Sequence, residues 1–216
     1  MREAYFLDFE FKTENLTFYP RPETELLVER AVDLLSKKKE HDAPYRILDI
    51  GTGCGNIAIS LTKYLPSSRI TASDISDTAL RAAGENAKKY GVEESIEFVK
   101  SDLFENIKGL YGEAFDLIIS NPPYISLEEL SSLPGEVKLD PYLALYGGRD
   151  GMGFYRRIIK EAPAFLKKDG MLLMEIGYNQ SESVRHMLDS SNVFKDVEIY
   201  KDYADIPRIV KAHKDG

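Results

Sequence analysis

The sequence predicts an α/β fold built on a seven-stranded, mostly parallel sheet with helices on both faces. From residue 46 onward, apolar runs of strand length alternate with longer segments of helical periodicity. This alternation is typical of right-handed β-α-β crossovers, which give parallel strands. The last two strand candidates, 196–200 and 209–212, are separated by only a short connection. It is too short for a parallel crossover, so these two strands are expected to form a C-terminal antiparallel hairpin.

Composition and charge narrow the class of protein. The 216 residues are 43% apolar and 30% charged, and no apolar run is long enough to cross a membrane, as expected of a soluble cytoplasmic domain. The single cysteine, Cys54, excludes an internal disulfide, and without clustered histidines no metal site is expected. The net charge is 28 − 36 = −8. A partner bound mainly through its phosphates would favour a basic face, so nucleic acid is disfavoured as the main substrate.

The N-terminal segment, residues 1–19, is predicted to form a short β-hairpin appended to a main domain at 20–216. Polarity alternates loosely through this segment. Phe9 and Phe11 precede a polar stretch at 12–15, which is the expected position of the turn.

Pro22 is expected to begin the first helix, because its fixed φ suits the first helical position. Leu27, Ala31 and Leu35 then recur on one apolar face. Residues 125–153 show little periodicity, and a connection of this length in a compact domain is commonly functional. The remaining strands are expected at 46–50, 70–75, 96–101, 117–120 and 171–176, and the remaining helices at 56–64, 78–90, 154–166 and 180–188.

A glycine-rich turn joins the first strand of the sheet to the next helix. It reads Gly51-Thr52-Gly53-Cys54-Gly55, and glycine at alternate positions lets the backbone approach a ligand without Cβ clashes. The spacing differs from the dinucleotide fingerprint G-x-G-x-x-G, and no phosphate-loop lysine follows. Because Asp49 precedes the turn, a cationic or neutral nucleoside fits better than a pyrophosphate. A purely structural turn is the alternative.

Two acidic residues end the following strands. Asp74 lies about 20 residues past the glycines, where a carboxylate can accept both hydroxyls of a ribose. The alternative is a helix N-cap, a role that Asp77 could fill instead. Asp102 ends the third strand, where its carboxylate suits the amino group of adenine. Leu103 or Phe104 could pack against that ring, although Phe104 can equally be a core residue.

A rigid corner, Asn121-Pro122-Pro123-Tyr124, follows the fourth strand. Each proline fixes φ and removes an N–H donor, so the corner presents hydrogen-bond acceptors. The Asn121 amide, the adjacent carbonyls and the Tyr124 ring form a cradle for a planar NH2 group. The alternative is a strand end that carries prolines by chance. All these motifs lie at carboxyl ends of parallel strands, where open α/β sheets bind ligands.

In combination, these motifs resemble those of the class I S-adenosylmethionine-dependent methyltransferases. The stretch from Asp49 to Gly55 matches that family's cofactor loop, Asp74 matches its ribose-binding acid, and Asn-Pro-Pro-Tyr is the signature of members that methylate planar nitrogens. Over roughly residues 9–213 the chain is similar to the peptide chain release factor glutamine methyltransferases. The further stretches that carry this similarity are Pro20–Glu25, Asn121–Ser126, Asp140-Pro141, Ala144-Leu145, Gly147-Gly148, Asp150-Gly151, Phe154–Ile158, Met174–Gly177, Asp202 and Pro207-Arg208.

The resemblance implies a Rossmann-like fold and S-adenosyl-L-methionine as methyl donor, with S-adenosyl-L-homocysteine as product. It implies methylation of the glutamine N5 in the Gly-Gly-Gln loop of translation release factors. The Asn121 Oδ1 and the Pro122 carbonyl would accept the two N–H bonds of that glutamine, so that positioning replaces a general base. The implied catalytic residues are Asn121, Pro122 and Tyr124; the implied substrate contacts add Pro123; and the implied cofactor contacts are Gly51, Thr52, Gly53, Cys54, Gly55, Asp74, Asp102, Leu103 and Asn121.

The chain departs from this family at its N-terminus. Family members usually carry an N-terminal helical domain that helps to engage the release factor, whereas only the hairpin precedes Pro20 here. An accessory subunit that replaces this domain is one expectation for substrate docking. Arg21, Glu23, Thr24 and Glu25 either border the pocket or merely favour a helix N-terminus.

Two other functions remain as alternatives. An RNA or DNA amino-methyltransferase would use the same corner, but the acidic charge and the extended similarity argue against it. A non-catalytic nucleoside-binding module would not need both the glycine turn and the Asn121–Tyr124 corner.

Overall fold

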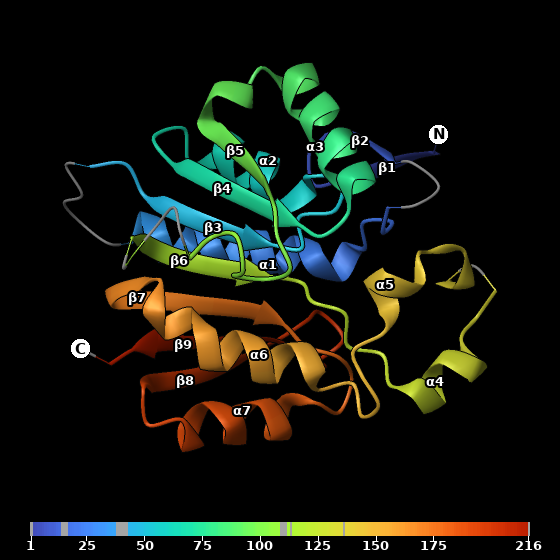
Figure 1. Cartoon of the computed structure of the whole chain (residues 1–216), viewed down its shortest axis with the longest axis vertical. Coiled ribbons are helices and arrows are strands. Elements are labelled where there is room, and N and C mark those ends of the chain that lie inside the picture. The colour runs from blue at the N-terminus through green and yellow to red at the C-terminus, as the bar shows by residue number, and fades with distance from the viewer. Residues whose placement is uncertain are drawn as a thin grey trace.

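The computed structural model describes residues 2–13, 17–37, 43–108, 112, 114–135 and 137–215. Its main feature is one seven-stranded sheet (Figure 1). The strands are β3 (Arg46–Ile50), β4 (Arg69–Asp74), β5 (Ile96–Lys100), β6 (Phe115–Ser120), β7 (Leu166–Glu175), β8 (Phe194–Lys201) and β9 (Pro207–Lys214).

The strand order is β5-β4-β3-β6-β7-β9-β8. Neighbouring strands are parallel from β5 to β7, and β9 pairs antiparallel with both β7 and β8. The predicted mostly parallel sheet and its C-terminal antiparallel hairpin are therefore confirmed. Among the described residues, no helix combines the length and apolar character that crossing a bilayer requires.

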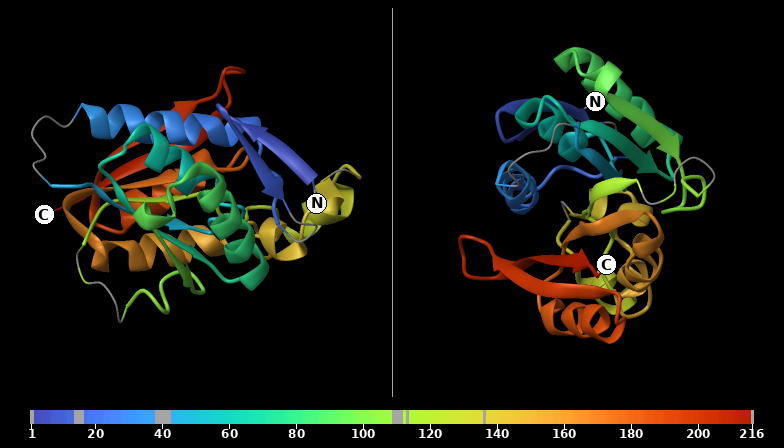
Figure 2. Two further views of the ribbon diagram at one scale, coloured as in Figure 1. Left: turned by 90° about the horizontal axis from the view of Figure 1, so that it is seen from above. Right: turned by 90° about the vertical axis from the view of Figure 1, so that its left-hand side faces the viewer.

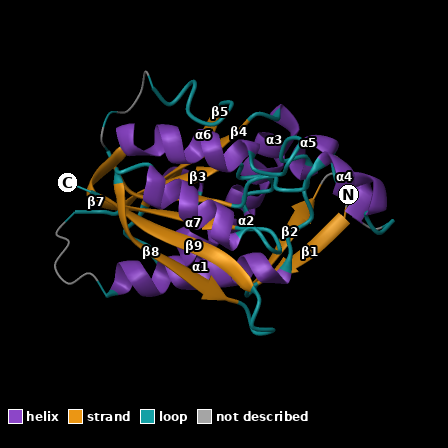
Figure 3. Cartoon of the chain, turned by 90° about the horizontal axis from the view of Figure 1, so that it is seen from below, coloured by secondary structure: helices purple, strands orange, loops and turns teal. Residues whose placement is uncertain are grey.

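Helices cover both faces of the sheet, because its strands alternate apolar side chains between two cores. In β3, Ile47 packs into the core that includes α1 (Pro22–Ser36), α2 (Asn56–Tyr64) and α3 (Asp77–Tyr90), and Leu48 into the core that includes α6 (Gly153–Glu161) and α7 (Ser181–Ser190). Figure 2 and Figure 3 show α1 and α6 on opposite sides of the strands. As predicted, α1 begins at Pro22 and buries Leu27, Ala31 and Leu35.

The N-terminal hairpin forms, but its turn is not at 12–15. Strands β1 (Arg2–Phe6) and β2 (Phe9–Thr13) pair antiparallel around a turn at Leu7 and Asp8. Burial explains the difference: Phe6 and Phe11 are fully buried in the same core as α1 and α2, and this requires the earlier turn. Residues 14 and 15 of the predicted turn lie outside the described part of the chain.

The boundary between α6 and β7 also differs from the expected one. The helix predicted at 154–166 ends at Glu161, and the 3-10 turn Ala162–Ala164 follows it. Pro163 explains this end, since proline has no N–H to continue the helical ladder. Strand β7 consequently begins at Leu166, five residues before the predicted start at 171.

The segment 125–153 contains helices that its weak periodicity did not predict. They are α4 (Leu127–Ser132), a 3-10 turn at Val137–Leu139 and α5 (Tyr142–Leu145), and another 3-10 turn, Glu93–Ser95, precedes β5. The side chains of Ser126 and Glu129 form a capping box at the start of α4, a local signal present in the sequence. In Figure 1, α4 and α5 lie beyond the carboxyl ends of the strands.

The hairpin is attached to α3 by a buried amide. Asn86 accepts from the Lys12 N–H at 3.0 Å and donates to the Lys12 carbonyl at 3.0 Å and to the Cys54 carbonyl at 2.9 Å. Nearby, the Tyr90 hydroxyl contacts the backbone of Glu10. One side chain thus joins the hairpin, α3 and the glycine turn.

Replacing this amide should destabilise the whole fold. Asn86→Ala leaves one N–H and two carbonyls without their partner, so we expect the free energy of unfolding to fall by about 2–3 kcal/mol. Urea unfolding with unchanged m-value measures this. The control is Glu85→Ala, at an exposed neighbour on the same helix, which should change stability by less than about 0.5 kcal/mol. Equal effects of the two substitutions would contradict the role given to Asn86.

Candidate functional site

The predicted site residues lie at the carboxyl ends of four neighbouring strands. The strand order β5-β4-β3-β6 places four of them side by side along one edge of the sheet, in the order Asp102, Asp74, Gly51 and Asn121. This is the edge at which open α/β sheets bind ligands. Strands remote in the sequence thus bring together the motifs that the sequence analysis singled out.

Two of the three glycines in the turn border open space. Gly51 and Gly53 have φ of +75° and +58°, and a Cβ added at either would meet no atom within 4 Å. Gly55, with φ of +86°, would instead place a Cβ 3.1 Å from the Cβ of Ala83. The first two glycines therefore leave room for a ligand against the backbone, whereas Gly55 permits the close packing of α3.

Asp74 holds the glycine turn in place. Its Oδ2 accepts from the Gly53 N–H and its Oδ1 from the Ser76 N–H, both at 2.9 Å. Burial raises the pKa of this half-buried carboxyl. Each carboxylate oxygen keeps a further lone pair, so Asp74 can still accept from a ligand hydroxyl.

Neither aspartate proposed as a helix cap is the N-cap of α3. Ser76 is the N-cap, and its hydroxyl oxygen accepts from the Ala79 N–H at 3.3 Å. The suggestion that Asp77 caps the helix was therefore wrong, because Asp77 forms an exposed ion pair with Lys100 at 2.5 Å. Asp and Ser are both good caps, and local sequence alone does not separate them.

A buried carboxylate lies beneath the turn. Asp49 is fully buried, accepts from the Thr52 hydroxyl at 2.7 Å through Oδ2, and has no hydrogen-bond partner at Oδ1 among the described residues. Burial, with a smaller contribution from Asp74, raises its pKa to about 7. When it is ionised, Asp49 would place negative charge beneath the open space, which fits a ligand that carries positive charge or N–H donors.

Cys54 directs its side chain away from the open space. The thiol is buried, which raises its pKa to about 12, and the Cys54 carbonyl already accepts from Asn86. The Thr52 hydroxyl is likewise used by Asp49. The Thr52 N–H already donates to the Ser73 carbonyl at 2.9 Å, so of these two residues only Cys54 could offer a ligand its backbone N–H.

Asp102 meets a partner that the sequence did not predict. Arg157 of α6 forms an ion pair with its Oδ1 at 2.9 Å. Leu103 is buried with φ of +51°, and Phe104 is fully buried and stacks on Phe165 with ring centroids 4.7 Å apart. Of the two readings offered for Phe104, the core residue is therefore the one observed.

Ile75 is a further site candidate that sequence analysis missed. It directly follows Asp74 and is 52% exposed. A large apolar side chain left in solvent beside the turn offers a flat surface for a ligand ring. The sequence pattern assigned Ile75 to the predicted strand 70–75 as a buried residue. In the structure β4 ends at Asp74, so Ile75 lies outside the strand.

The Asn121 side chain is hydrogen-bonded to Thr24 of α1, which lies 97 residues earlier in the chain. Its Nδ2 donates to the Thr24 hydroxyl oxygen at 2.9 Å, and the Thr24 hydroxyl donates to Glu175 Oε2 at 2.7 Å. Thr24 is 1% exposed and Glu175 is 2% exposed. Thr24 therefore contacts the predicted corner, and whether it borders a substrate or cofactor pocket stays a prediction.

The residues next to Thr24 have other partners. Arg21 forms an ion pair with Asp140 at 2.5 Å, which ties the start of α1 to the 125–153 segment. Glu25 accepts from the Leu7 N–H at 2.9 Å and so holds the hairpin turn. Glu23 is exposed at the start of α1.

The backbone of the corner is packed tightly from behind. Gln180 donates to the Tyr124 carbonyl at 2.9 Å and accepts from the Gly177 N–H at 3.0 Å. A Cβ at Gly147 would lie 2.6 Å from the Tyr124 Cα, and one at Gly151 would lie 2.5 Å from the Tyr124 carbonyl oxygen. Glycine is thus required at both positions. The corner is fixed by backbone contacts in addition to its prolines.

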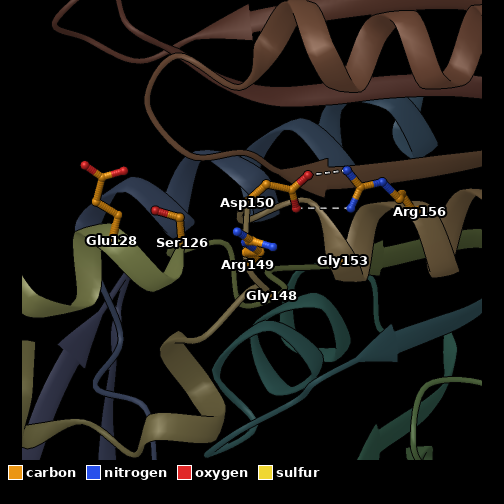
Figure 4. A pocket seen from close by; sticks show the side chains of 7 residues that line it. All are labelled: Ser126, Glu128, Gly148, Arg149, Asp150, Gly153 and Arg156. Atoms are coloured by element: carbon orange, nitrogen blue, oxygen red, sulfur yellow. Dashed lines mark hydrogen bonds and ion pairs between the residues drawn. The ribbon is translucent and has the colours of Figure 1, made fainter.

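A polar cavity of about 630 Å³ lies beside this packed segment, and it includes neither Asn121 nor the glycine turn. Arg156 and Asp150 form an ion pair, Arg149 comes from the same loop as Asp150, and Glu128 comes from α4 on the side opposite Arg156 (Figure 4). Among the described residues, no group of three or more His, Cys, Asp or Glu side chains is arranged to hold a metal ion. The cavity is lined by Ser126, Glu128, Gly148, Arg149, Asp150, Gly153 and Arg156.

Comparison with known proteins finds a family model and relatives that align over nearly the whole of this chain. The model described as "Methyltransferase small domain" matches residues 24–132. The release factor glutamine methyltransferase of Chlorobaculum tepidum is 41% identical over 210 residues, which cover 95% of this chain and 70% of that protein. The protein of the same name from Moorella thermoacetica is 35% identical over 209 residues, which cover 97% of this chain and 71% of that protein.

Solved structures with the same fold are more distant in sequence. The ribosomal protein L11 methylase of Lactobacillus delbrueckii subsp. bulgaricus matches with a TM-score of 0.63 and 24% identity, over 92% of this chain and 82% of that one. The N-terminal domain of human METTL16 in complex with SAH matches with a TM-score of 0.68 and 18% identity, over 94% of this chain and 74% of that one. At these identities the likeness concerns the fold alone, which is Rossmann-like.

The buried Asp49 predicts how stability changes with pH. Its folded pKa of about 7 lies above the ordinary value of 3.8, so between about pH 4 and pH 7 the folded chain keeps a proton that the unfolded chain has lost. The contribution of Asp49 to stability therefore falls as pH rises through this window and is constant above it. Asp49→Asn has no such dependence. Its free energy of unfolding, relative to wild type, should rise by about 1–2 kcal/mol between pH 5 and pH 7.

Urea unfolding of both proteins at matched pH values measures this difference. Taking the difference cancels the titration of groups that the two proteins share. A difference that stays constant from pH 5 to pH 7.5 would show that Asp49 is not held protonated in the folded chain.

Proposed function

The chain belongs to the release factor glutamine methyltransferase family, and on that premise we propose that it methylates the side-chain amide nitrogen of a glutamine in a translation release factor, with S-adenosyl-L-methionine as methyl donor. It is a methyltransferase by its family, and relatives named for this activity align over nearly the whole chain. RNA or DNA amino-methylation is not favoured, because the neighbour solved with a nucleic acid, the METTL16 catalytic domain in complex with the MAT2A 3'UTR hairpin 6, shares only the fold at 17% identity. A cytoplasmic location follows from this substrate.

The observation that carries the proposal is the adjacency of the turn and the corner. Strands β3 and β6 pair with Ile50 opposite Ser120, and the Ser120 hydroxyl donates to the Ile50 carbonyl at 2.8 Å. The next residue on each strand is Gly51 or Asn121. Because paired strands lie about 4.8 Å apart, a donor held at the turn and an amide held at the corner would be neighbours.

The part of the proposed site that would bind the methyl donor consists of the glycine turn and the strand ends beside it. The open space at Gly51 and Gly53 fits the amino-acid part of the cofactor, and Asp49 beneath it favours that part's positive charge. Asp74 would accept the ribose hydroxyls. Asp102 and Leu103 remain the proposed neighbours of the adenine, and the exposed Ile75 adds apolar surface. When bound, the cofactor supplies an electrophilic sulfonium methyl group.

The part of the site that would bind the methyl acceptor, the Asn121–Tyr124 corner, would act by orienting the substrate amide. An amide nitrogen is a weak nucleophile because its lone pair is delocalised into the carbonyl. Asn121 Oδ1 and the Pro122 carbonyl would accept its two N–H bonds and hold the nitrogen in line with the methyl group. Such alignment can lower a barrier by up to about 7–11 kcal/mol. Pro123 keeps the corner rigid and Tyr124 flanks the amide plane. The nitrogen would gain the methyl group as the bond between that group and the cofactor sulfur breaks, and its proton would leave to solvent afterwards.

The polar cavity would receive the polypeptide on either side of the glutamine. It borders the 147–151 segment that packs on Tyr124, and it offers charges of both signs from Arg149, Arg156, Glu128 and Asp150. We propose residues 20–216 as the catalytic unit and residues 1–19 as an appended segment, whose hairpin of β1 and β2 packs against α3.

Removing the Asn121 amide should abolish transfer without abolishing cofactor binding. For Asn121→Ala we expect the kcat for methylation of a release factor to fall by at least about 100-fold, because a preorganised acceptor is lost. The dissociation constant of S-adenosyl-L-homocysteine should stay close to that of wild type. Asn192→Gly is the control, since it removes an amide from an exposed turn at φ of +55° that glycine tolerates. Near-wild-type turnover by Asn121→Ala would rule out the proposed role.

Removing the charge of Asp74 should act on cofactor affinity. Asp74→Asn loses charged hydrogen bonds to the ribose, so we expect the dissociation constant of S-adenosyl-L-homocysteine to rise by about 10-fold or more. Asp77→Asn is a matched control at an exposed carboxylate three residues away, and it should change the constant by less than about 2-fold. Calorimetric titration compares the two. An unchanged constant for Asp74→Asn would leave Asp74 only the role of holding the turn.

A further inference from the structure

A buried hydrogen-bonded relay lies behind the corner. It connects Asn121, at the end of β6, through Thr24 on α1 to Glu175 at the end of β7, with separations of 2.9 Å and 2.7 Å. Thr24 and Glu175 are almost fully buried, whereas Asn121 is only half-buried and can face a substrate. Three elements that are distant in the sequence therefore converge on the side chain that would accept a hydrogen bond from the substrate amide.

The direction of the relay follows from counting hydrogens. A threonine hydroxyl has one hydrogen, and an ionised carboxylate can only accept. Thr24 must therefore give its hydrogen to Glu175, which leaves its oxygen as an acceptor. The Asn121 NH2 group turns toward that oxygen, and its Oδ1 consequently points the other way.

We propose that Thr24 and Glu175 are positioning residues that orient the Asn121 amide so that its oxygen, and not its nitrogen, faces the substrate NH2 group. The inference rests on the proposed function for its consequence in catalysis. Its structural part, the orientation of the Asn121 amide, stands on the relay alone. A reversed Asn121 would meet the substrate with donor against donor and would lose the contact that holds the nitrogen in line.

Protonation of Glu175 would remove this directionality. A protonated Glu175 can donate to Thr24, which frees the Thr24 hydrogen for Asn121 Oδ1 and permits the reversed amide. Burial raises the pKa of Glu175 to about 7, while the Thr24 hydroxyl and the Arg208 guanidinium lower it and Glu23 raises it. The pKa values of Tyr124 and Tyr155, which also face Glu175, are raised well above this range. The relay is therefore directional above about pH 7 and is lost progressively below it.

Substitutions at Thr24 separate the hydrogen bond from the shape of the side chain. Thr24→Val keeps the shape and loses the hydroxyl, so we expect kcat to fall by about 10- to 100-fold, the range found for residues that support a functional group from behind. The KM for S-adenosyl-L-methionine should not change. Thr24→Ser restores the hydroxyl and should restore most of the activity. Thr62→Val is the matched control, because the buried Thr62 hydroxyl donates only to the Ala58 carbonyl of its own helix.

The pH profile adds a reading that a merely structural role would not change. Wild-type kcat should fall as pH drops through about 7, and this step should be absent from Thr24→Val and from Glu175→Gln. A Thr24→Val enzyme with wild-type kcat, or with the wild-type pH step, would overturn the proposal. So would a folded Thr24→Ser enzyme that recovers nothing.

The orientation itself can be measured without turnover. In the 15N spectrum, the Asn121 side-chain NH2 should exchange slowly with solvent in wild type and much faster in Thr24→Val. Equal exchange rates would overturn the relay. If wild-type enzyme leaves the release factor unmethylated, the proposed function fails, while the exchange rates still decide whether Thr24 orients Asn121.

Discussion

Strands β3 and β6 pair with Ile50 opposite Ser120, and this register sets the separation between the two halves of the site. A shift by one residue would turn every side chain of a strand to the opposite face of the sheet, so the two apolar cores on either face hold the register strongly. The glycine turn and the Asn121 corner begin one residue later on their strands. The distance between the methyl donor and the acceptor amide is thus a consequence of the packed sheet, and the loops that follow the two strands do not have to supply it.

Two buried carboxylates lie at this edge of the sheet, and each belongs to a different half of the site. Asp49 lies beneath the turn, with one oxygen that has no hydrogen-bond partner in the described part of the chain, and Glu175 lies behind the corner at the end of the Thr24 relay. Burial raises the pKa of both to about 7. Keeping carboxylates in such places costs stability. This cost is consistent with groups that are retained for binding and orientation.

The sequence predicted what local patterns encode and missed what distant contacts decide. Alternating strand and helix periodicity predicted the sheet, and contiguous motifs marked the Gly51–Gly55 turn and the Asn121–Tyr124 corner. The hairpin turn was misplaced because burial of Phe6 and Phe11 overrides a polar stretch. Thr24 and Glu175 are 151 residues apart, so no local pattern announces their contact. Pro163 and the Ser126 capping box were local signals that could have been used.

The central claim is that a preorganised corner presents acceptors to the amide of a protein glutamine. Its most direct test is a competition in one reaction that contains the enzyme, S-adenosyl-L-methionine labelled in its methyl group, a translation release factor and total RNA. The account predicts label in the release factor, located by mass spectrometry on a glutamine side chain. Label in the RNA alone would contradict it.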